Sequence, residues 1–331
     1  MTSALTAPRS EVPAVLGRAG VLLAPAVEAA VDRLSPELQP ALRHHLAPGA
    51  KHVRAALAVL SAAAAGGSEE DGLPGAVAVE LVHNFSLLHD DIIDGDLERR
   101  HRPTVWAAFG CGQAIIAGDA LAMFAVQLLL EEPTPPRVRA AAVLAEATQA
   151  MIAGQAQDMA FETQGEVSAD ECLAMERGKT GALVSCAASL GAILVAAPPP
   201  VVHALADYGT HLGLAFQAVD DLLGIWGDRH RTGKPVGNDL LQHKKTLPVV
   251  LALARDDRAG RLRRVLEGDL DAAGLARAVA MLEECGARED TAALADRHLQ
   301  AALSALDRAG LVAGPAAELE AVARFVTARD R

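Results

Sequence analysis

The chain has 331 residues, a formal net charge of −12, and a composition in which 51% of residues are hydrophobic but only 3% are aromatic. This negative charge opposes binding to a nucleic-acid backbone or to an anionic membrane surface, so we expect neither as a partner. The core must consist mainly of Ala, Leu and Val, of which Ala and Leu favour helix.

Helices account for nearly all of the predicted structure. We expect residues 1–11 to form a flexible arm and residues 12–331 a single helical domain. Ser35-Pro36-Glu37 is typical of a helix start, and Ser168 to Glu171 resembles a capping box. No run of alternating β-branched residues predicts a strand. The predicted helices begin near Val12 and Ser35, span residues 53–65, 77–94, 113–131, 137–159, 171–195 and 201–226, and continue as shorter helices to residue 329.

The cysteines and the apolar runs indicate the cellular setting. The four cysteines are far apart and form neither a C-x-x-C pair nor a zinc-like pattern, so a reduced, cytoplasmic protein is expected. The N-terminal region lacks the basic start and continuous apolar run of a signal peptide. No segment contains about 18 uninterrupted apolar residues, so the sequence predicts no membrane span.

An acidic cluster ends one of the long apolar runs, where the sequence from His89 to Asp96 reads H-D-D-I-I-D-G-D. At about 100° per residue, Asp90 and Asp94 fall on one helical face, one turn apart, with Asp91 beside them. Like charges this close repel each other unless divalent cations bind between them. Ligands that are all oxygen favour magnesium or manganese over zinc or copper.

A second cluster about 130 residues later starts with Asp220 and Asp221, but Gly224 replaces the acid one turn on. Either cluster alone is equally compatible with an ordinary solvated helix end. Two of them, each at the end of a long apolar helix, make coincidence much less plausible. The pair therefore predicts a metal-binding site shared by two helices.

The surrounding motifs carry a resemblance to a known family. The first cluster reads D-D-x-x-D and is followed by R-R-H-R-P-T-V from Arg99. Later the chain reads G-K-P-V-G-N-D from Gly233 and K-K-T-L-P from Lys244. In this order the motifs strongly resemble the trans-type isoprenyl diphosphate synthases, most closely the geranylgeranyl diphosphate synthases.

The resemblance implies a fold and a reaction. The fold is all-α, a single-domain bundle of long, mostly antiparallel helices around a deep central cavity, and the enzyme is a homodimer. These enzymes join an allylic diphosphate to isopentenyl diphosphate and release pyrophosphate. They use three magnesium ions, for which manganese is a possible substitute.

The resemblance also implies roles for the acids and for the cations around the leaving group. Asp91 and Asp221 would orient the metal ligands, and Gly224 would weaken metal binding without abolishing activity. Lys244 and its neighbour Lys245 are also compatible with ordinary surface residues. The implied metal ligands are Asp90, Asp94 and Asp220, and the implied diphosphate-binding cations are Arg99, Lys179, Lys234 and Lys244.

The second substrate, isopentenyl diphosphate, would bind in a basic pocket made by the protein alone. Where relatives often read G-G-K-R-L-R-P, this chain keeps two cations but lacks the middle arginine and the final proline. His83 would otherwise be an ordinary core histidine. The residues implied for this pocket are Lys51, Arg54, His83 and Arg100; Thr180 and Gln217 would face the allylic carbon, with Phe216 lining the same wall.

Product length in this family depends on residues before the first cluster. Phe85 and Ser86, five and four residues before Asp90, resemble the pattern of geranylgeranyl diphosphate synthases. An ideal helical wheel, however, turns Phe85 away from the face that carries the aspartates. A twenty-carbon product is therefore a hypothesis at this point.

Three other interpretations remain open. A class I terpene cyclase also uses metal-binding acids on facing helices, but it has no use for Lys51, Arg54 and Arg100 together. A non-catalytic partner subunit of a prenyl synthase would be expected to lose acids of the first cluster, which are intact here. An HD-type phosphohydrolase would use His83 and His89-Asp90, but its remaining histidine ligands have no evident place.

Overall fold

The structure is a computed structural model that describes every residue except 1–11, 47–50, 228–236, 256–259, 269 and 329–331. The helices are α1 (Ala14–Asp32), α2 (Gln39–His45), α3 (Val53–Ala64), η1 (Glu70–Gly72), α4 (Leu73–Ile93), α5 (Val105–Phe109), α6 (Cys111–Leu130), α7 (Pro135–Thr163), α8 (Ala169–Glu176), η2 (Arg177–Gly181), α9 (Ala182–Leu194), α10 (Pro199–Trp226), α12 (Asn238–Leu241), α13 (Leu247–Arg255), α14 (Arg261–Leu266), α15 (Ala272–Glu284), α16 (Ala287–Asp307) and α17 (Ala313–Thr327). Two strands, β1 (Glu98–Arg99) and β2 (Arg102–Pro103), form one hairpin. The all-α prediction is confirmed.

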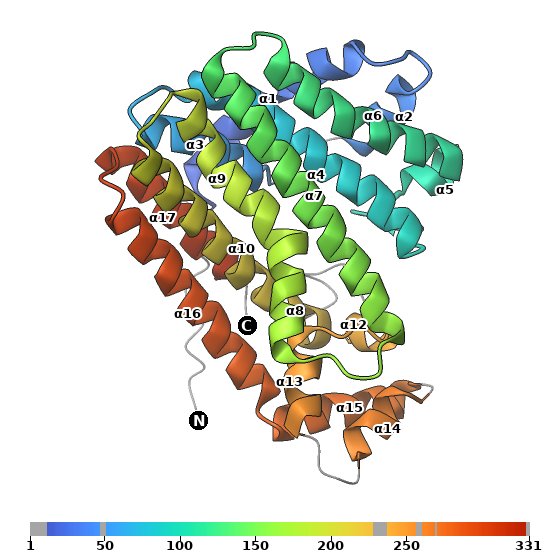
Figure 1. Cartoon of the computed structure of the whole chain (residues 1–331). Helices are drawn as coiled ribbons and strands as arrows, with labels where there is room; N and C mark the ends of the chain where they lie inside the picture. The colour runs from blue at the N-terminus through green and yellow to red at the C-terminus, as the bar shows by residue number, and fades with distance from the viewer. Residues whose placement is uncertain (1–11, 47–50, 228–236, 256–259, 269, 329–331) are drawn as a thin grey trace, which may run out of the picture.

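The long helices form a bundle with a group of short helices at one end (Figure 1). Helices α4, α6, α7, α9, α10 and α16 run side by side along the long axis, and α16 packs along α10. Helices α12 to α15 gather at the end where α8 and α10 meet them. They enclose a small apolar cluster of their own around Ile225, Leu240 and Leu282. The main core runs between the long helices of the bundle.

Small residues let the central helices approach closely. Helices α3 and α9 touch where a Cβ added to Gly191 would lie 2.1 Å from the carbonyl oxygen of Ala58. At the same contact the backbone N–H of Gly191 donates to Oγ of Ser61 at 3.0 Å. An alanine-rich core reaches native packing density in this way, by close backbone approach instead of large aromatic side chains.

Of the local predictions, two were wrong and the capping box was right. Ser35-Pro36-Glu37 forms a turn, and α2 starts at Gln39, because the Ser35 hydroxyl bonds the Glu37 carboxylate and caps no helix. The prediction without strands missed the short hairpin β1–β2. The capping box is confirmed, since Ser168 Oγ accepts a hydrogen bond from the backbone N–H of Glu171, whose side chain bonds back.

Two helices, α1 and α6, are long and apolar enough to cross a membrane by length and composition, and 39% of each apolar window is buried in the fold. The sequence predicted no span because residues such as Arg18, Glu28 and Asp119 interrupt both apolar runs. Helices in the core of a globular protein pass the same test, so neither α1 nor α6 identifies a membrane protein.

Candidate active site

Helix α4 ends at the first acidic cluster. Asp91 is 1% exposed, and its Oδ1 atom accepts a hydrogen bond from Nε of Arg99 at 2.7 Å. Burial raises the pKa of Asp90 to about 6, while the charge of Lys179 opposes that rise. Asp94 is exposed at the C-cap of α4. One aspartate of the cluster is therefore fixed by an arginine, and two remain available to a ligand.

A strained hairpin carries two of the arginines of the site, Arg99 and Arg100. Strand β1 pairs antiparallel with β2, and the turn residues Arg100 and His101 have φ angles of 53° and 60°. Such two-residue turns usually contain Asn or Gly, because a left-handed backbone costs other residues roughly 1–2 kcal/mol. This strain occurs where Arg99 bonds Asp91 of the first cluster and Arg100 lines a pocket with Arg54, and backbone strain of this kind is common at functional sites.

Lys179 and Thr180 lie in η2, a π-helical turn between α8 and α9. Single π-turns inserted between α-helical segments are frequent at functional sites. The Lys179 ammonium bonds the carboxylate of Asp158 on α7. A Cβ at Gly154 would lie 2.3 Å from the backbone nitrogen of Lys179, so only glycine permits this approach of α7 to the turn. The sequence prediction missed Asp158, because its partner lies 21 residues away.

A chain of hydrogen bonds connects this π-turn to the second acidic cluster. The Thr180 hydroxyl donates to Oε1 of Gln217 at 2.7 Å, and Nε2 of Gln217 donates to Oδ1 of Asp221 at 2.8 Å. The other oxygen of Asp221 accepts from the backbone N–H of Leu247 at 3.0 Å. Thr180, Gln217 and Asp221 are therefore held as one unit, which fixes the direction of each polar group.

Behind Asp221 lies a buried acid that the sequence did not single out. Glu176 is 3% exposed, and burial together with the neighbouring charge of Asp221 raises its pKa well above the usual range. Burial likewise raises the pKa of Asp221 to about 7. The Cys172 thiol donates to Glu176 at 3.5 Å. Two buried carboxyl groups, Asp221 on α10 and Glu176 on α8, therefore lie next to each other at the end of α10.

A pocket of about 390 Å³ contains all four residues predicted to bind isopentenyl diphosphate. Arg54 Nη1 donates to Nε2 of His83 at 3.3 Å, and Arg54 Nε is buried without a hydrogen-bond partner in the part of the chain that the structure describes. Burial and the charge of Arg54 lower the pKa of His83 well below its usual range, so His83 is a neutral acceptor. The predicted residues that line this pocket are Lys51, Arg54, His83, Arg99, Arg100, Phe216 and Asp220.

The C-terminal helix closes the same pocket. The Lys51 ammonium lies 5.4 Å from the centroid of the Phe325 ring on α17, and Val326 contributes to the lining. His45, which the sequence prediction missed, lines an adjoining pocket together with Arg99 and Arg100. Burial lowers the pKa of His45 to about 4, so it adds no positive charge.

The ends of α4 and α10 lie close to each other. Asp220 at the end of α10 and Leu87 near the end of α4 line one pocket. Lys244, which follows α12, reaches the first cluster with its Nζ atom 3.5 Å from Oδ2 of Asp94. The charge of Asp94 raises the pKa of Lys244 against the effect of burial, and Asp239 adds to the rise. Lys234 lies outside the described residues.

The donor set fits a magnesium ion. Asp90, Asp94 and Asp220 offer only carboxylate oxygens, which Mg²⁺ prefers. Oδ2 of Asp91 is buried and has no partner among the described residues. Within those residues, no three acidic, histidine or cysteine side chains form a ready-made metal cage. Mg²⁺ usually keeps several waters and is bound by one or two carboxylates plus substrate phosphates.

The two residues predicted to set product length lie beneath the first cluster. Phe85 is 8% exposed, and its ring meets the His89 ring edge-on at 4.9 Å. A Cβ at Gly118 on α6 would lie 2.4 Å from Nε2 of His89, so this layer packs directly on α6. Ser86 is half-buried, with its hydroxyl donating to the His83 carbonyl at 2.8 Å.

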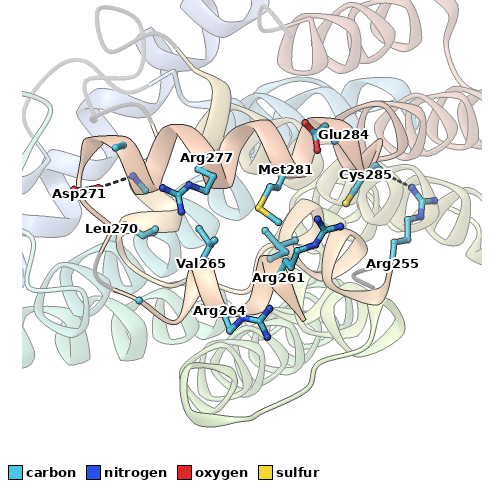
Figure 2. A pocket seen from close by; sticks show the side chains of 14 residues that line it. Arg255, Arg261, Arg264, Val265, Leu270, Asp271, Arg277, Met281, Glu284 and Cys285 are labelled. Carbon is cyan, nitrogen blue, oxygen red and sulfur yellow. Dashed lines mark hydrogen bonds between the residues drawn. The ribbon is translucent and has the colours of Figure 1, made fainter. Parts of the chain in front are cut away.

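A larger pocket of about 870 Å³ lies elsewhere, between α13, α14 and α15 (Figure 2). It contains four arginines but none of the predicted site residues. Arg255 already donates to the carbonyl of Cys285 at 2.8 Å and pairs with Asp290. Arg264 and Arg277 are exposed to solvent. We assign this pocket no part in the chemistry of the acidic clusters.

Carboxylates at the ends of α4 and α10, beside a basic pocket in an all-α bundle, are suited to binding a diphosphate through divalent metal ions and cations. The polyprenyl synthetase family model matches residues 35–282, and the chain belongs to this family of prenyltransferases.

Known proteins resemble the chain over nearly its whole length. The (2E,6E)-farnesyl diphosphate synthase of Mycobacterium tuberculosis is 44% identical over 96% of this chain and 93% of its own length. The geranylgeranyl diphosphate synthase of the same species is 42% identical over 88% of each. Among solved structures, a polyprenyl synthetase from Streptomyces coelicolor is 47% identical with a TM-score of 0.91, covering 96% of this chain and 99% of that one.

Proposed function

We propose that the chain condenses isopentenyl diphosphate with an allylic diphosphate, either dimethylallyl, geranyl or farnesyl diphosphate, and releases pyrophosphate. The main support for the proposal is one basic pocket, which includes Asp220 of the second acidic cluster and Leu87, three residues before Asp90 of the first cluster. One diphosphate would be held through metal by Asp90, Asp94 and Asp220. The other would be held by cations alone.

The basic pocket favours a synthase over a terpene cyclase. A cyclase converts a single diphosphate and would leave Lys51, Arg54 and Arg100 without a ligand. Nε of the Arg54 guanidinium is buried and lacks a partner among the described residues. A buried cation that is not fully hydrogen-bonded is costly unless an anion binds it. Isopentenyl diphosphate is the anion that this reaction provides.

In the proposed reaction the allylic carbon–oxygen bond breaks toward a carbocation, and the leaving pyrophosphate takes up the electron pair. Divalent magnesium, with manganese as a substitute, would neutralise that negative charge. Lys179, Arg99 and Lys244 would add charge-assisted hydrogen bonds to the phosphate oxygens. Asp91 would keep Arg99 in place through the 2.7 Å hydrogen bond between them.

The new carbon–carbon bond would form when the isopentenyl double bond attacks the allylic cation. The oxygens of Thr180 and Gln217 would stabilise the cation without capturing it, while Phe216 would help to exclude water. Loss of a proton from the condensed product would complete the reaction. The released pyrophosphate is a sufficient base, so none of the side chains described above has to accept the proton.

For the product we propose geranylgeranyl diphosphate. The relatives described above include both a farnesyl and a geranylgeranyl synthase at nearly equal identity, so identity favours neither length. Phe85 with the small Ser86 one position on supports the twenty-carbon product. The layer of Phe85 and His89 against α6 would be the barrier that stops the growing tail.

We further propose a cytoplasmic homodimer. Ile116, Met123 and Leu130 on α6 are exposed at intervals of seven residues, and so are Ile152 and Met159 on α7. Such spacing places each set on one helical face, and exposed apolar stripes of this kind favour an interface with another protein surface. The four cysteines are all free, as expected in a reducing compartment.

The test is a condensation assay with each allylic primer, labelled isopentenyl diphosphate and Mg²⁺, followed by sizing of the product. We expect chiefly twenty-carbon diphosphate and no product with EDTA. Chiefly fifteen- or thirty-carbon material would refute the product length. Cyclic hydrocarbon from a single diphosphate would support a cyclase instead, and failure of the purified protein to turn over alone would support a non-catalytic subunit.

A further inference from the structure

His44, in the last turn of helix α2, contacts the hairpin that carries Arg100. Its Nε2 atom donates to the carbonyl oxygen of Pro103 on β2 at 2.8 Å. Nη2 of Arg102 donates to Nδ1 of the same ring at 3.3 Å. An arginine can only donate and a carbonyl oxygen can only accept, so in the neutral ring the proton is on Nε2. Both ring nitrogens of His44 therefore hold strand β2.

His44 itself has a fixed position. Ala41 and Leu42, on the same helix, are 1% and 0% exposed, so α2 is anchored in the main core. The His44 ring also meets the Phe109 ring of α5 edge-on, with 5.4 Å between the centroids. Because His44 and Pro103 are 59 positions apart, their contact connects the hairpin to a separate part of the fold.

The turn of this hairpin needs such a support, because its backbone is unfavourable for its residues. Strands β1 and β2 pair with Arg99 opposite Arg102. Arg100 and His101 form the turn between them, with φ angles of 53° and 60°. Glycine and asparagine adopt this left-handed conformation far more easily than arginine or histidine. Strained residues of this kind persist only where the surrounding contacts fix them.

The side chain of Arg100 depends on this backbone for its position. It lines the basic pocket together with Lys51 and Arg54. Within the part of the chain that the structure describes, its guanidinium makes no hydrogen bond or ion pair. Arg99, by contrast, is fixed by its 2.7 Å hydrogen bond to Asp91. Loosening of the hairpin should therefore displace Arg100 more than Arg99.

We propose that His44 is a positioning residue for isopentenyl diphosphate, because it holds strand β2 and thereby keeps Arg100 in the basic pocket. This inference rests on the proposed function, in which cations alone bind that diphosphate. His44 does not line the pocket, so its role is indirect. It should matter less for the allylic diphosphate, which is bound mainly through metal ions and near which Arg99 keeps its own bond.

The test uses variants that separate the hydrogen bonds of His44 from the packing of its ring. His44→Phe keeps a ring beside Phe109 but cannot donate to Pro103, whereas His44→Gln keeps a donor. His101→Gly removes the cost of the left-handed backbone, and it is made alone and together with His44→Phe. The control is His203→Phe, at an exposed position of α10.

Two measurements follow the pocket and the hairpin without requiring turnover. Calorimetry gives the Kd of isopentenyl diphosphate without metal, and the Kd of a thio analogue of dimethylallyl diphosphate with Mg²⁺. Hydrogen exchange reports the protection of backbone amides in residues 97–104, among them the Thr104 N–H that donates to the Leu97 carbonyl. Thermal unfolding shows whether each variant is folded.

We expect His44→Phe to weaken binding of isopentenyl diphosphate by about fivefold or more, and to speed up amide exchange in the hairpin. The Kd of the allylic analogue should stay within about twofold, as should both Kd values of His203→Phe. His44→Gln should bind within about threefold of the wild type. The double variant should bind within about twofold of His101→Gly alone, because a turn without strain no longer needs His44.

An isopentenyl diphosphate affinity in His44→Phe equal to that of the control would overturn the inference. So would an equal loss for both substrates, because His44 would then support the fold in general. A double variant that binds no better than His44→Phe would also contradict it, since strain at His101 would play no part. If His44→Phe does not fold, His44→Ala takes its place with the same expectations.

The proposed function fails in a different way. Absence of condensation product from the wild type would refute it, and the binding and exchange data would still report on His44.

Discussion

The ammonium group of Lys244 lies 3.5 Å from the carboxylate of Asp94, although the two residues are 150 positions apart in the chain. Lys244 follows the second acidic cluster, and Asp94 belongs to the first. This contact therefore brings the segment after α12 next to the end of α4. A lysine between two acidic clusters neutralises part of their charge and remains available to a diphosphate.

The Lys244→Ala variant should weaken binding of the allylic diphosphate by about tenfold or more, since a hydrogen bond to a charged group contributes roughly 1.5–3 kcal/mol. Lys244→Arg should retain most of the affinity. Lys245→Ala is the matched control, because the Lys245 ammonium bonds the Gln164 carbonyl instead of an acid. Equal KM values for Lys244→Ala and Lys245→Ala would show that Lys244 is an ordinary surface residue.

Gln217 connects Thr180 to Asp221, so its removal should disturb both. We expect Gln217→Leu to lower kcat by about tenfold or more with a smaller effect on KM, because the polar groups that face the cation lose their orientation. Thr180→Val should behave similarly, whereas Thr180→Ser keeps the hydroxyl and most of the rate. Steady-state kinetics with wild-type thermal stability provides the check; an unchanged kcat in Gln217→Leu contradicts the assigned role.

Phe85 and Ser86 should control product length in opposite directions. Phe85→Ala removes a buried ring beside His89 and leaves a cavity, so the product should become longer than twenty carbons. Ser86→Phe places a ring in the same layer and should shorten the product to fifteen carbons. Chromatography of the dephosphorylated products measures both effects. Unchanged product length in both variants would mean that the tail grows along another path.

The stability of the fold should fall in mild acid because of a histidine pair. The Nδ1 atoms of His211 on α10 and His298 on α16 lie 3.0 Å apart. Burial, together with the charges of His211 and Arg177, lowers the pKa of His298 to about 4. In the unfolded chain a histidine has a pKa of about 6.5. Between these values the unfolded state binds more protons, so the free energy of unfolding decreases as pH falls from about 6.5 to 4.

The variant His298→Gln lacks one group of this pair. Its Tm should therefore fall less than that of the wild type between about pH 7 and pH 5. His203→Gln, at an exposed position of α10, should follow the wild type. If Tm falls equally with pH in the wild type and in His298→Gln, the histidine pair is not the source of the acid sensitivity.

Local patterns in the sequence were enough to predict the helices and the acidic clusters. Asp90, Asp94 and Asp220 stand out because helical periodicity relates residues within a few positions of one another. The capping box at Ser168 was predictable for the same reason. The start of α2 was not, because the Ser35 hydroxyl found a side-chain partner instead of a backbone N–H.

Contacts between distant segments could not be predicted in the same way. Asp158 contacts Lys179 from another helix, and Asp239 reaches Gly224 from beyond the end of α10. No spacing rule relates such residues, and an isolated acid has no periodicity of its own. The turn at Arg100 was also hidden, because arginine and histidine rarely adopt the left-handed backbone that it requires.

The most direct test of the account is a crystal structure with Mn²⁺ and a non-hydrolysable thio analogue of dimethylallyl diphosphate, with the metal located by anomalous scattering. We expect anomalous peaks beside Asp90 and Asp94 and beside Asp220, with one diphosphate bridging them. Peaks at only one cluster, or a diphosphate bound in the arginine-lined pocket of α13 to α15, would contradict it.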